Sequence, residues 1–275
     1  MGWGYKTVLM VGCTAGLGVA MAERMIENGS FVIAVGRRKD RLDAFKEKHG
    51  GDKVAVSRFD ITDVDAIQGW AEGIIKDHPT LDCVVLNAGI QRPLNFARPK
   101  AIDVGLVRKE IDTNYTSYVA MMAAFLPHLT SQQQQEGKKR TTTALIAVSS
   151  GLALVPLPRC ANYCATKAAL HALMWSLRAQ LAADEASRGV VKVIEIVPPA
   201  VQTELHELQE DMRAAGLANI GITIEEYMKD CWAGLENGDE EILIGPIKQR
   251  FAHLEDERKA AFKNFVSATA DQGPK

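Results

Sequence analysis

The hydrophobic residues of this chain fall into short runs of Val, Ile, Leu and Met, separated by stretches with helical spacing. Continuous apolar runs of this length are typical of strands that are covered on both faces. We expect strands at 7–12, 31–36, 53–58, 82–87, 143–149 and 190–197, and a seventh near 241–245. Helices are expected near 16–28, 39–48, 63–77, 103–129 and 161–185. This alternation predicts an α/β fold, a doubly wound parallel sheet of seven strands with helices on both faces.

Three segments depart from the alternation. Residues 130–143 are polar and of low complexity, which indicates a solvated loop. Residues 204–237 carry two helical stretches, and the second opens at Thr223 with Glu226 three residues later, a capping-box pattern. Residues 247–266 repeat apolar side chains at three- and four-residue steps, which predicts an amphipathic C-terminal helix. Because no linker interrupts residues 1–275, we expect one domain in which 204–237 is a helical insertion on the substrate side.

Composition and charge narrow the class of protein. The chain has 275 residues, 47% of them hydrophobic, and a net charge of −2. The net charge is close to zero, and charges of both signs are spread along the chain, which argues against nucleic acid as a partner. Five scattered cysteines without a Cys-x-x-Cys pair predict free thiols in a reducing compartment. No signal-peptide pattern is present, and no apolar run approaches the ~18 residues of a membrane span. We therefore expect a cytoplasmic protein without a membrane partner.

Gly12, Gly16 and Gly18 lie between the first expected strand and the first expected helix. Glycines in this place allow a tight turn, a close approach of backbone N–H groups to a pyrophosphate, and close packing of helix on strand, as in Rossmann-type folds. The sequence therefore predicts a dinucleotide site. The alternative is a glycine-rich turn that binds no ligand.

Arg37 and Arg38 follow Gly36 at the end of the second expected strand. Proteins that prefer NAD usually carry an acid at this place, which bonds the ribose 2′-hydroxyl. Guanidinium groups instead offer a planar fork to phosphate oxygens. The pair therefore favours NADP(H), although exposed charges at the start of a helix would give the same pattern.

Tyr163 and Lys167 lie four residues apart in the helix expected at 161–185, so they share one helix face. A nearby cation favours the ionised form of a phenol, which makes the two residues a candidate acid–base pair. Ser149 and Ser150 end the preceding strand, at the sheet edge where doubly wound folds bind ligands. A serine hydroxyl there can hydrogen-bond a carbonyl oxygen as charge develops on it. Two exposed helix residues remain the alternative for the Tyr–Lys pattern.

Two asparagines belong to the same neighbourhood. Asn87, in Asn87-Ala88-Gly89, ends the fourth expected strand at the ligand-binding edge, and Asn114 lies in the long helix before the serine strand. Asn87 can equally be a structural tie between neighbouring strands.

Taken together, these motifs resemble the short-chain dehydrogenase/reductase family, and the resemblance runs from Lys6 to about Thr203. The glycine spacing is similar to the shorter branch of the family rather than to the epimerase-like branch. The matching segments, in chain order, are the Gly12 to Gly18 turn, Asp60-Ile61, Asn87-Ala88-Gly89, Asn114, Ser150, Tyr163-x-x-x-Lys167 and Pro198 to Thr203.

The resemblance implies roles for four catalytic residues. Tyr163 would donate or accept the proton, and Lys167 would lower the pKa of the phenol and bind the nicotinamide ribose. Ser150 would orient the substrate oxygen, and Asn114 would hold a water in a proton relay. Ser150 is preferred to Ser149 because it lies thirteen residues before Tyr163, the interval of the family.

The resemblance also implies a set of cofactor contacts, with Asp60 and Ile61 beside the adenine and Val201 and Thr203 beside the nicotinamide carboxamide. The expected cofactor-binding residues are Gly12, Thr14, Gly16, Leu17, Gly18, Arg37, Arg38, Asp60, Ile61, Asn87, Ala88, Gly89, Tyr163, Lys167, Pro198, Val201 and Thr203. A homodimer or homotetramer would be similar to the family.

Three residues depart from the family pattern. Val11 replaces a threonine that commonly precedes the first glycine, and Pro199 replaces the usual glycine after Pro198. Ala15 lacks the basic side chain that some NADP-binding members carry in the turn. The NADP(H) interpretation therefore depends on Arg37 and Arg38.

We thus expect an NADP(H)-dependent oxidoreductase that transfers a hydride between nicotinamide and a small carbonyl or alcohol substrate, with no metal. Reduction of an imine or enone, cyclisation in the same pocket, and a non-catalytic NADP-binding regulator remain alternatives. Substrate choice is expected to lie with residues 91–98 and with apolar residues of the insertion. The candidates are Leu205, Leu208, Met212, Tyr227 and Trp232, each of which could instead be core.

Overall fold

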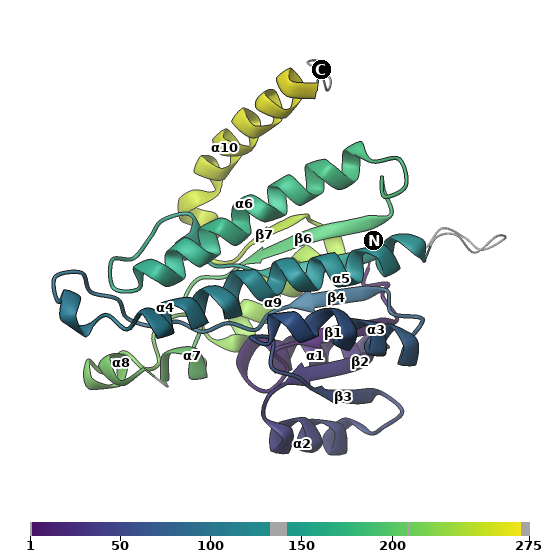
Figure 1. The fold of residues 1–275 in the computed structure, drawn as a ribbon, viewed down its shortest axis with the longest axis horizontal. Coiled ribbons are helices and arrows are strands. Elements are labelled where there is room, and N and C mark those ends of the chain that lie inside the picture. Colours follow the sequence, from purple (N-terminus) through teal and green to yellow (C-terminus); the bar gives the residue numbers. More distant parts are fainter. Residues whose placement is uncertain (1, 133–141, 208, 271–275) are drawn as a thin grey trace.

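Seven parallel strands form a single sheet at the centre of the chain (Figure 1). The computed structural model describes residues 2–132, 142–207 and 209–270. The strands are β1 (Thr7–Val11), β2 (Phe31–Gly36), β3 (Val54–Arg58), β4 (Cys83–Leu86), β5 (Thr143–Val148), β6 (Val191–Val197) and β7 (Glu241–Leu243). Their order is β3-β2-β1-β4-β5-β6-β7, so the winding direction reverses between β1 and β4. The doubly wound sheet predicted from the sequence is confirmed, with strand ends that differ from the expected ones by one or two residues.

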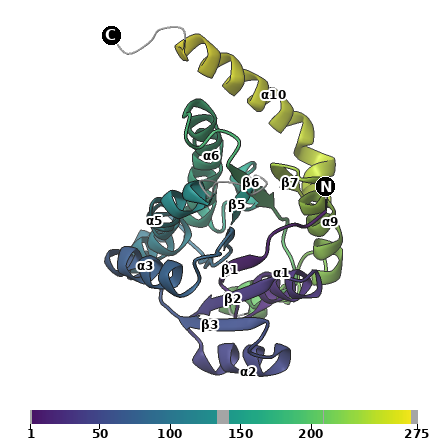
Figure 2. The same ribbon diagram turned by 90° about the vertical axis from the view of Figure 1, so that its right-hand side faces the viewer.

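Helices cover both faces of the sheet (Figure 2). Successive residues of a strand point to opposite faces, so Val8 and Met10 join one core cluster while Leu9 and Val11 join the other. The first cluster lies under α1 (Gly16–Glu27), α2 (Lys39–His49) and α9 (Ile224–Asn237). The second lies under α3 (Ile67–Asp77), α5 (Ser117–Ser131) and α6 (Ala161–Ala183). Both faces are buried, which explains why the strands read as continuous apolar runs.

The single long helix expected at 103–129 is divided in the structure. It consists of α4 (Val104–Ile111), one turn of π-helix at Asp112–Thr116, and α5. Such turns are rare and concentrate at functional sites. Asn114 lies in this turn, and its side chain hydrogen-bonds the backbone of Ile90 in another segment. The hydrophobic pattern could not show this interruption because a single widened turn barely changes the helical spacing.

The insertion contains three helices where two stretches were expected. They are α7 (Glu204–Glu207), α8 (Glu210–Ala214) and α9. The first expected stretch is broken at Gln209, whose side chain bonds both Leu205 O and Gln91. The predicted capping box of Thr223 and Glu226 is present at the start of α9.

The last helix, α10 (Pro246–Ala270), extends the expected 247–266 helix at both ends. Its first turn lies near the sheet, and its far end projects away from the rest of the chain (Figures 1 and 2). Within the three described ranges, no helix is long and apolar enough to cross a lipid bilayer. All five cysteines are buried free thiols, as predicted. Most of the polar loop expected at 130–143 lies outside the described residues.

Candidate active site

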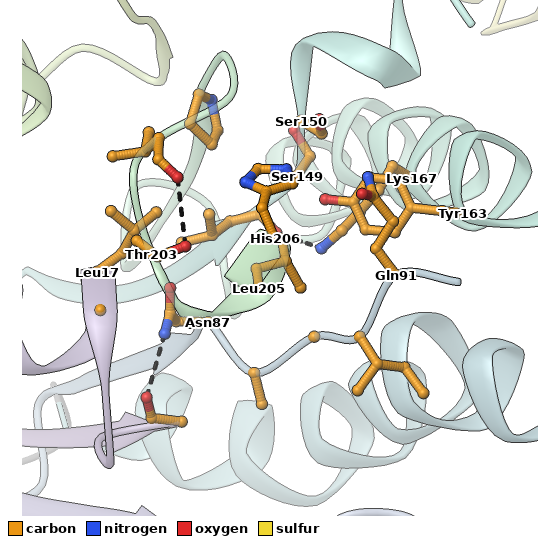
Figure 3. A pocket seen from close by; sticks show the side chains of 18 of the residues that line it. Leu17, Asn87, Gln91, Ser149, Ser150, Tyr163, Lys167, Thr203, Leu205 and His206 are labelled. Atoms are coloured by element: carbon orange, nitrogen blue, oxygen red, sulfur yellow. Dashed lines mark hydrogen bonds between the residues drawn. The ribbon is translucent and has the colours of Figure 1, made fainter. Parts of the chain in front are cut away.

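A pocket of about 840 Å³ lies at the carboxyl edge of the sheet. Open α/β sheets bind ligands at this edge, where the strand order reverses. The pocket runs from Arg37 and Arg38 past the glycine turn to Tyr163 and on to the insertion. Figure 3 shows Ser149, Ser150, Tyr163, Lys167 and His206 gathered at one part of it, with Leu17, Asn87 and Thr203 farther along. The pocket therefore joins segments from the whole length of the chain.

The glycine turn is packed too closely to carry side chains at Gly12 and Gly18. Gly12 has a φ of +89°, and a Cβ there would lie 2.7 Å from Ala88 N. A Cβ on Gly18 would lie 2.2 Å from Gly12 O, so the turn packs directly on itself and on α1. No side chain caps the first turn of α1, which leaves backbone N–H groups at the pocket for an anion. This cradle fits the diphosphate of a dinucleotide.

The guanidinium groups beside the turn have carboxylate partners that the local sequence did not reveal. Arg37 Nη1 lies 3.7 Å from Asp60 Oδ2. Arg38 donates to Thr14 Oγ1 at 3.1 and 2.8 Å and to Glu204 Oε2 at 2.7 Å. Burial tends to raise the pKa of Asp60, but hydrogen bonds from Thr62 and the charge of Arg37 outweigh this and lower it. Both arginines thus line the pocket as expected, but each already faces an acid.

Asn87 ties the end of β4 to the glycine turn. Its Nδ2 donates to Gly12 O at 3.3 Å, so the structural role considered for this residue is present. Asn87, Ala88 and Gly89 also line the pocket. A contact with a ligand stays a prediction for all three.

Tyr163 and Lys167 are both buried at the pocket, 6% and 3% exposed. Lys167 Nζ donates to Val148 O at 2.8 Å and lies 5.8 Å from the centre of the Tyr163 ring. Ser150 stands at the end of β5, and its Oγ accepts from Leu152 N at 3.1 Å. The Tyr–Lys pair is therefore not a pair of exposed helix residues, because the fold turns this face of α6 towards the sheet.

The electrostatics of the pair differ from the expectation that Lys167 lowers the pKa of the phenol. Burial raises the pKa of Tyr163, and hydrogen bonding with Ser150 opposes the rise. Burial also lowers the pKa of Lys167 to about 8, against the charge of Glu195. Burial, rather than the charge of Lys167, therefore dominates the pKa of Tyr163.

Asn114 lies behind the pocket rather than in its lining. It is fully buried, and its side chain accepts from Ile90 N at 2.9 Å and donates to Ile90 O at 2.8 Å and to Thr166 Oγ1 at 3.2 Å. These contacts hold the segment after Gly89 against α6. They support a positioning role, and the water-holding role implied by the family resemblance stays a prediction.

Among the expected cofactor residues, Gly18 does not line the pocket, and the remaining ones lie along it. Leu17, Ile61, Pro198, Val201 and Thr203 all line it. All three departures from the family pattern, Val11, Ala15 and Pro199, line it as well. A Cβ on Gly16 would lie 3.1 Å from Thr203 Cγ2, so the glycine turn and the Pro198 to Thr203 segment meet directly.

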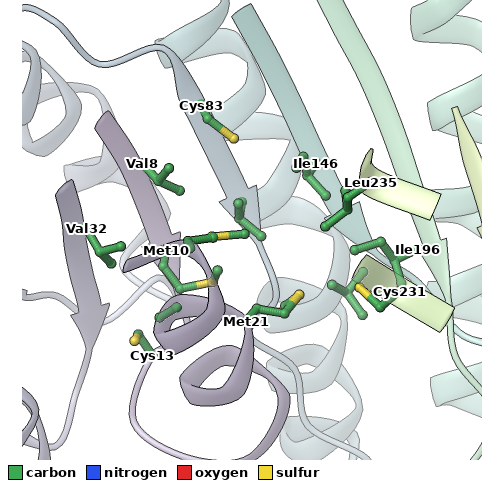
Figure 4. Close-up of a cluster of buried hydrophobic side chains, with 14 of the residues drawn as sticks. Val8, Met10, Cys13, Met21, Val32, Cys83, Ile146, Ile196, Cys231 and Leu235 are labelled. Atoms are coloured by element: carbon green, nitrogen blue, oxygen red, sulfur yellow. The ribbon is translucent and has the colours of Figure 1, made fainter. Parts of the chain in front are cut away.

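Only some of the candidates for the substrate end line the pocket, and their role in substrate choice stays a prediction. Leu205 and Met212 line the pocket, as do Gln91 and Arg92, whereas residues 93–98 do not. Tyr227 and Trp232 do not line the pocket. They belong to the core cluster between α9 and α1, part of which Figure 4 shows around Met21, Cys231 and Leu235. Leu208 lies outside the described residues. The helical pattern marks apolar positions but not whether a cleft or another helix faces them.

Three charged or polar residues line the pocket that were not predicted from the sequence, namely Arg159, Glu204 and His206. His206 is 7% exposed, and its Nδ1 has no hydrogen-bond partner in the described part of the chain. Burial lowers the pKa of His206, which keeps the ring neutral near pH 7. Arg159 pairs with Asp211 of α8 at 2.6 Å. No motif marks these residues, and the partners of Arg159 and Glu204 in the fold, Asp211 and Arg38, are distant from them in sequence.

The arrangement of a doubly wound sheet, a glycine turn and a Tyr–Lys pair on one pocket is that of nucleotide-dependent α/β oxidoreductases. A family model for short chain dehydrogenases matches residues 6–214. The chain is 34% identical over 257 residues to DltE, an uncharacterized oxidoreductase of Bacillus subtilis (strain 168), and the match covers 94% of this chain and 93% of the relative. The chain therefore belongs to the short chain dehydrogenase family.

Solved structures agree with this assignment. A short chain dehydrogenase from Burkholderia cenocepacia J2315 in complex with NADP has a TM-score of 0.73 and 28% identity, covering 96% of this chain and 98% of the other. A short chain dehydrogenase/reductase from Burkholderia phymatum in complex with NAD has a TM-score of 0.78 and 15% identity, covering 95% and 96%. The second comparison shows the shared fold alone. The two neighbours thus carry different forms of the nicotinamide dinucleotide.

Proposed function

We propose that this chain is an NADP(H)-dependent oxidoreductase that interconverts a small carbonyl compound and the corresponding alcohol. The observation that carries the proposal is the pocket itself, in which Ser150, Tyr163 and Lys167 lie at one part of the crevice that begins at Arg37 and Arg38. A protein that only binds nucleotide has no chemical need for the first three residues. The short chain dehydrogenase from Burkholderia cenocepacia in complex with NADP supports this choice of cofactor.

The cofactor would be held by the segments that line the crevice. The turn from Gly12 to Gly18 would take the diphosphate, and Arg38 with Thr14 would take the 2′-phosphate. Asp60 and Ile61 would border the adenine, and Val201 with Thr203 would border the carboxamide. When bound, the cofactor supplies the hydride to the carbonyl carbon or accepts it from the alcohol carbon. All other parts of the reaction fall to residues of this chain.

Tyr163 Oη would give its proton to the carbonyl oxygen during reduction. Ser150 Oγ would donate a hydrogen bond to the same oxygen as negative charge develops on it. A phenol whose pKa is raised by burial is a protonated donor near neutral pH, which suits the reductive direction. Lys167 would orient the nicotinamide ribose from its place beside Val148 O.

The insertion 204–237 would act as a lid over the substrate. Leu205, His206 and Met212 supply three of the side chains that line the pocket. Closing an active site in this way removes water and strengthens the hydrogen bonds inside it. The substrate would thus contact mainly apolar groups, together with the imidazole of His206.

The proposed chemistry is tested with Tyr163→Phe, which removes only the hydroxyl. We expect kcat for NADPH-dependent reduction of a ketone or aldehyde to fall by about 10²–10⁴-fold, the usual contribution of general acid catalysis, with little change in NADPH affinity. Turnover is followed by the absorbance of the reduced nicotinamide, and affinity by calorimetry.

Two neighbouring serines provide a matched control. Ser150→Ala should also lower kcat, whereas Ser149→Ala should leave it nearly unchanged, because the hydroxyl of Ser149 lies 3.4 Å from Ile196 O and is not assigned to the substrate. Full activity of Tyr163→Phe on every carbonyl substrate would show that the assigned chemistry is wrong.

A further inference from the structure

Glu204 reaches the adenosine half of the pocket although it begins the insertion that would cover the substrate. It is the first residue of α7, directly after Thr203. Its Oε2 accepts from Arg38 Nη1 at 2.7 Å, and its Oε1 makes a short contact with Arg41 Nη1. Arg38 and Glu204 are 166 residues apart in sequence. One carboxylate therefore bridges two guanidinium groups at the start of α2.

The two arginines are also fixed on the side of the glycine turn. Arg38 donates to Thr14 Oγ1, and Arg41 Nη1 donates to Thr14 O at 3.2 Å. The side chains of Arg38, Arg41 and Glu204 are 38%, 41% and 30% exposed, so the cluster is partly screened by water rather than deeply buried. Burial tends to raise the pKa of Glu204, but the hydrogen bonds from Arg38 and Arg41 outweigh this and lower it. The bridge is therefore charged at neutral pH.

One of the two guanidinium groups that Glu204 occupies, that of Arg38, is the group that the proposed function assigns to the 2′-phosphate. A guanidinium offers a limited set of N–H donors in fixed directions, and carboxylate and phosphate oxygens use the same ones. Two anions placed on the same arginine also repel each other. A 2′-phosphate on Arg38 must therefore weaken or displace the contact with Glu204, whereas NAD(H), which carries a hydroxyl at this position, need not do so.

We infer that Glu204 is a cofactor-specificity residue, a latch on the lid that competes with the 2′-phosphate of NADP(H) for Arg38 and Arg41. This inference rests on the proposed NADP(H)-dependent function. Because α7 carries both Glu204 and the pocket residues Leu205 and His206, displacement of the carboxylate frees the start of the lid at the moment the cofactor binds. The coupling is reciprocal, so a lid that is latched weakens NADP(H) binding and leaves NAD(H) binding almost unchanged.

The experiment uses adenosine 2′,5′-bisphosphate as the probe, because it carries the 2′-phosphate but no nicotinamide. Adenosine 5′-monophosphate is the matched nucleotide without that phosphate. Their dissociation constants are measured by calorimetry on the full chain and on Glu204→Gln, Glu207→Gln and Arg38→Ala. Glu207→Gln removes the same charge from the same short helix, where Glu207 is exposed and makes no ion pair with any residue in the described ranges.

We expect Glu204→Gln to bind the bisphosphate roughly three- to tenfold more tightly than wild type, the size expected for two partly exposed ion pairs. Its affinity for the monophosphate should change less than about twofold, and Glu207→Gln should bind both nucleotides like wild type. The inference is wrong if Glu204→Gln binds the bisphosphate no more tightly than Glu207→Gln does. Glu204 would then have no effect on phosphate binding, or would favour it by holding the arginines in place.

The two proposals can fail separately. Wild type should prefer the bisphosphate to the monophosphate, and Arg38→Ala should lose that preference. If wild type does not prefer the bisphosphate to the monophosphate, the NADP(H) assignment is wrong, and the inference about Glu204 is wrong as well. If the preference is present and depends on Arg38 but Glu204→Gln does not increase it, only the latch is wrong.

Discussion

At the scale of single residues, Lys167 shows how the fold changes the chemistry of a side chain. The residue is 3% exposed and lies between the rings of Tyr118 and Tyr163, with Val148 O as its hydrogen-bond acceptor. Burial lowers the pKa of its amine from 10.5 to about 8. The amine therefore gains or loses its proton close to physiological pH, as is common for residues at functional sites.

This shift has a consequence for stability without cofactor. Between pH 8 and 10.5 the unfolded chain binds more protons at Lys167 than the folded chain does, so the contribution of Lys167 to the free energy of unfolding rises with pH in this window. Below pH 8 the buried amine costs up to about 3 kcal/mol. We expect Lys167→Met to have a larger free energy of unfolding than wild type at pH 7. Loss of the hydrogen bond from Lys167 leaves Val148 O without its partner, which reduces this gain by about 1 kcal/mol.

Urea unfolding at several pH values measures the difference. The advantage of Lys167→Met should decline as pH rises from 8 to 10.5. A difference that stays constant over this range would show that the amine of Lys167 has an ordinary pKa in the folded protein.

At the scale of elements, a buried ionic cluster attaches α10 to α6 and β6. His171 Nδ1 lies 2.9 Å from Glu195 Oε1, and His171 Nε2 lies 2.9 Å from Glu255 Oε2. All three side chains are at most 1% exposed, and Arg258 pairs with Glu255 at 2.5 Å. Burial opposes the charged imidazole, but the contacts with Glu195 and Glu255 outweigh it and raise the pKa of His171 to about 9. The first half of α10 is thus held by charges as well as by apolar contacts.

The cluster predicts a pH-dependent contribution to stability. Because the folded-state pKa lies above the ordinary value of 6.5, the stabilisation is complete below pH 6.5 and is lost as pH rises to 9. We expect the stability difference between wild type and His171→Gln to shrink by up to about 3 kcal/mol over this window. Denaturant unfolding of both proteins from pH 6 to 9.5 tests this.

Hydrogen exchange gives a local readout of the same cluster. Amides of α10 should lose protection in His171→Gln before those of the central strands do, because the far end of α10 projects away from the rest of the chain. A stability difference that does not depend on pH would contradict a charged His171.

At the scale of the whole molecule, the insertion is tied to the body of the protein at both ends of the pocket. At the cofactor end the tie is Glu204. At the substrate end, Arg159 donates to Asp211 at 2.7 Å and to Gln209 at 2.6 Å, and Gln209 donates to Gln91 at 3.1 Å. These contacts join the loop before α6, the insertion and the segment after β4. The shape of the substrate end therefore depends on segments that are 50 to 118 residues apart.

Loosening the tie at the substrate end should affect substrate binding more than chemistry. We expect Arg159→Ala to raise KM for the carbonyl substrate by roughly tenfold, since a charged bidentate pair is lost, with a smaller change in kcat and in the KM for NADPH. Arg213→Ala is the matched control, because Arg213 is exposed on α8 and lies outside the pocket. Steady-state kinetics in both substrates distinguishes the two effects, and an equal loss in kcat would argue against a lid role for this segment.

The order of strands and helices, and the residues that end each strand at the ligand-binding edge, could be predicted because both depend on local patterns. The apolar runs of β1 to β7 and the capping box of Thr223 and Glu226 are examples. The sequence left open whether Tyr227 and Trp232 line the pocket or lie in the core under α1, since a helical pattern does not identify the surface that faces it. The π-helical turn around Asn114 was hidden for a similar reason.

The sequence by itself determined the doubly wound fold, the glycine turn, and the presence of Ser150, Tyr163 and Lys167 at one edge of the sheet, because periodicity and strand-end position are properties of short segments. Only the tertiary structure decided that Glu204 bridges Arg38 and Arg41, that Asn114 braces Ile90, and that burial sets the pKa values of Tyr163 and Lys167. These features depend on which distant segments pack together and on how much water they exclude, and no local pattern in the chain carries that information.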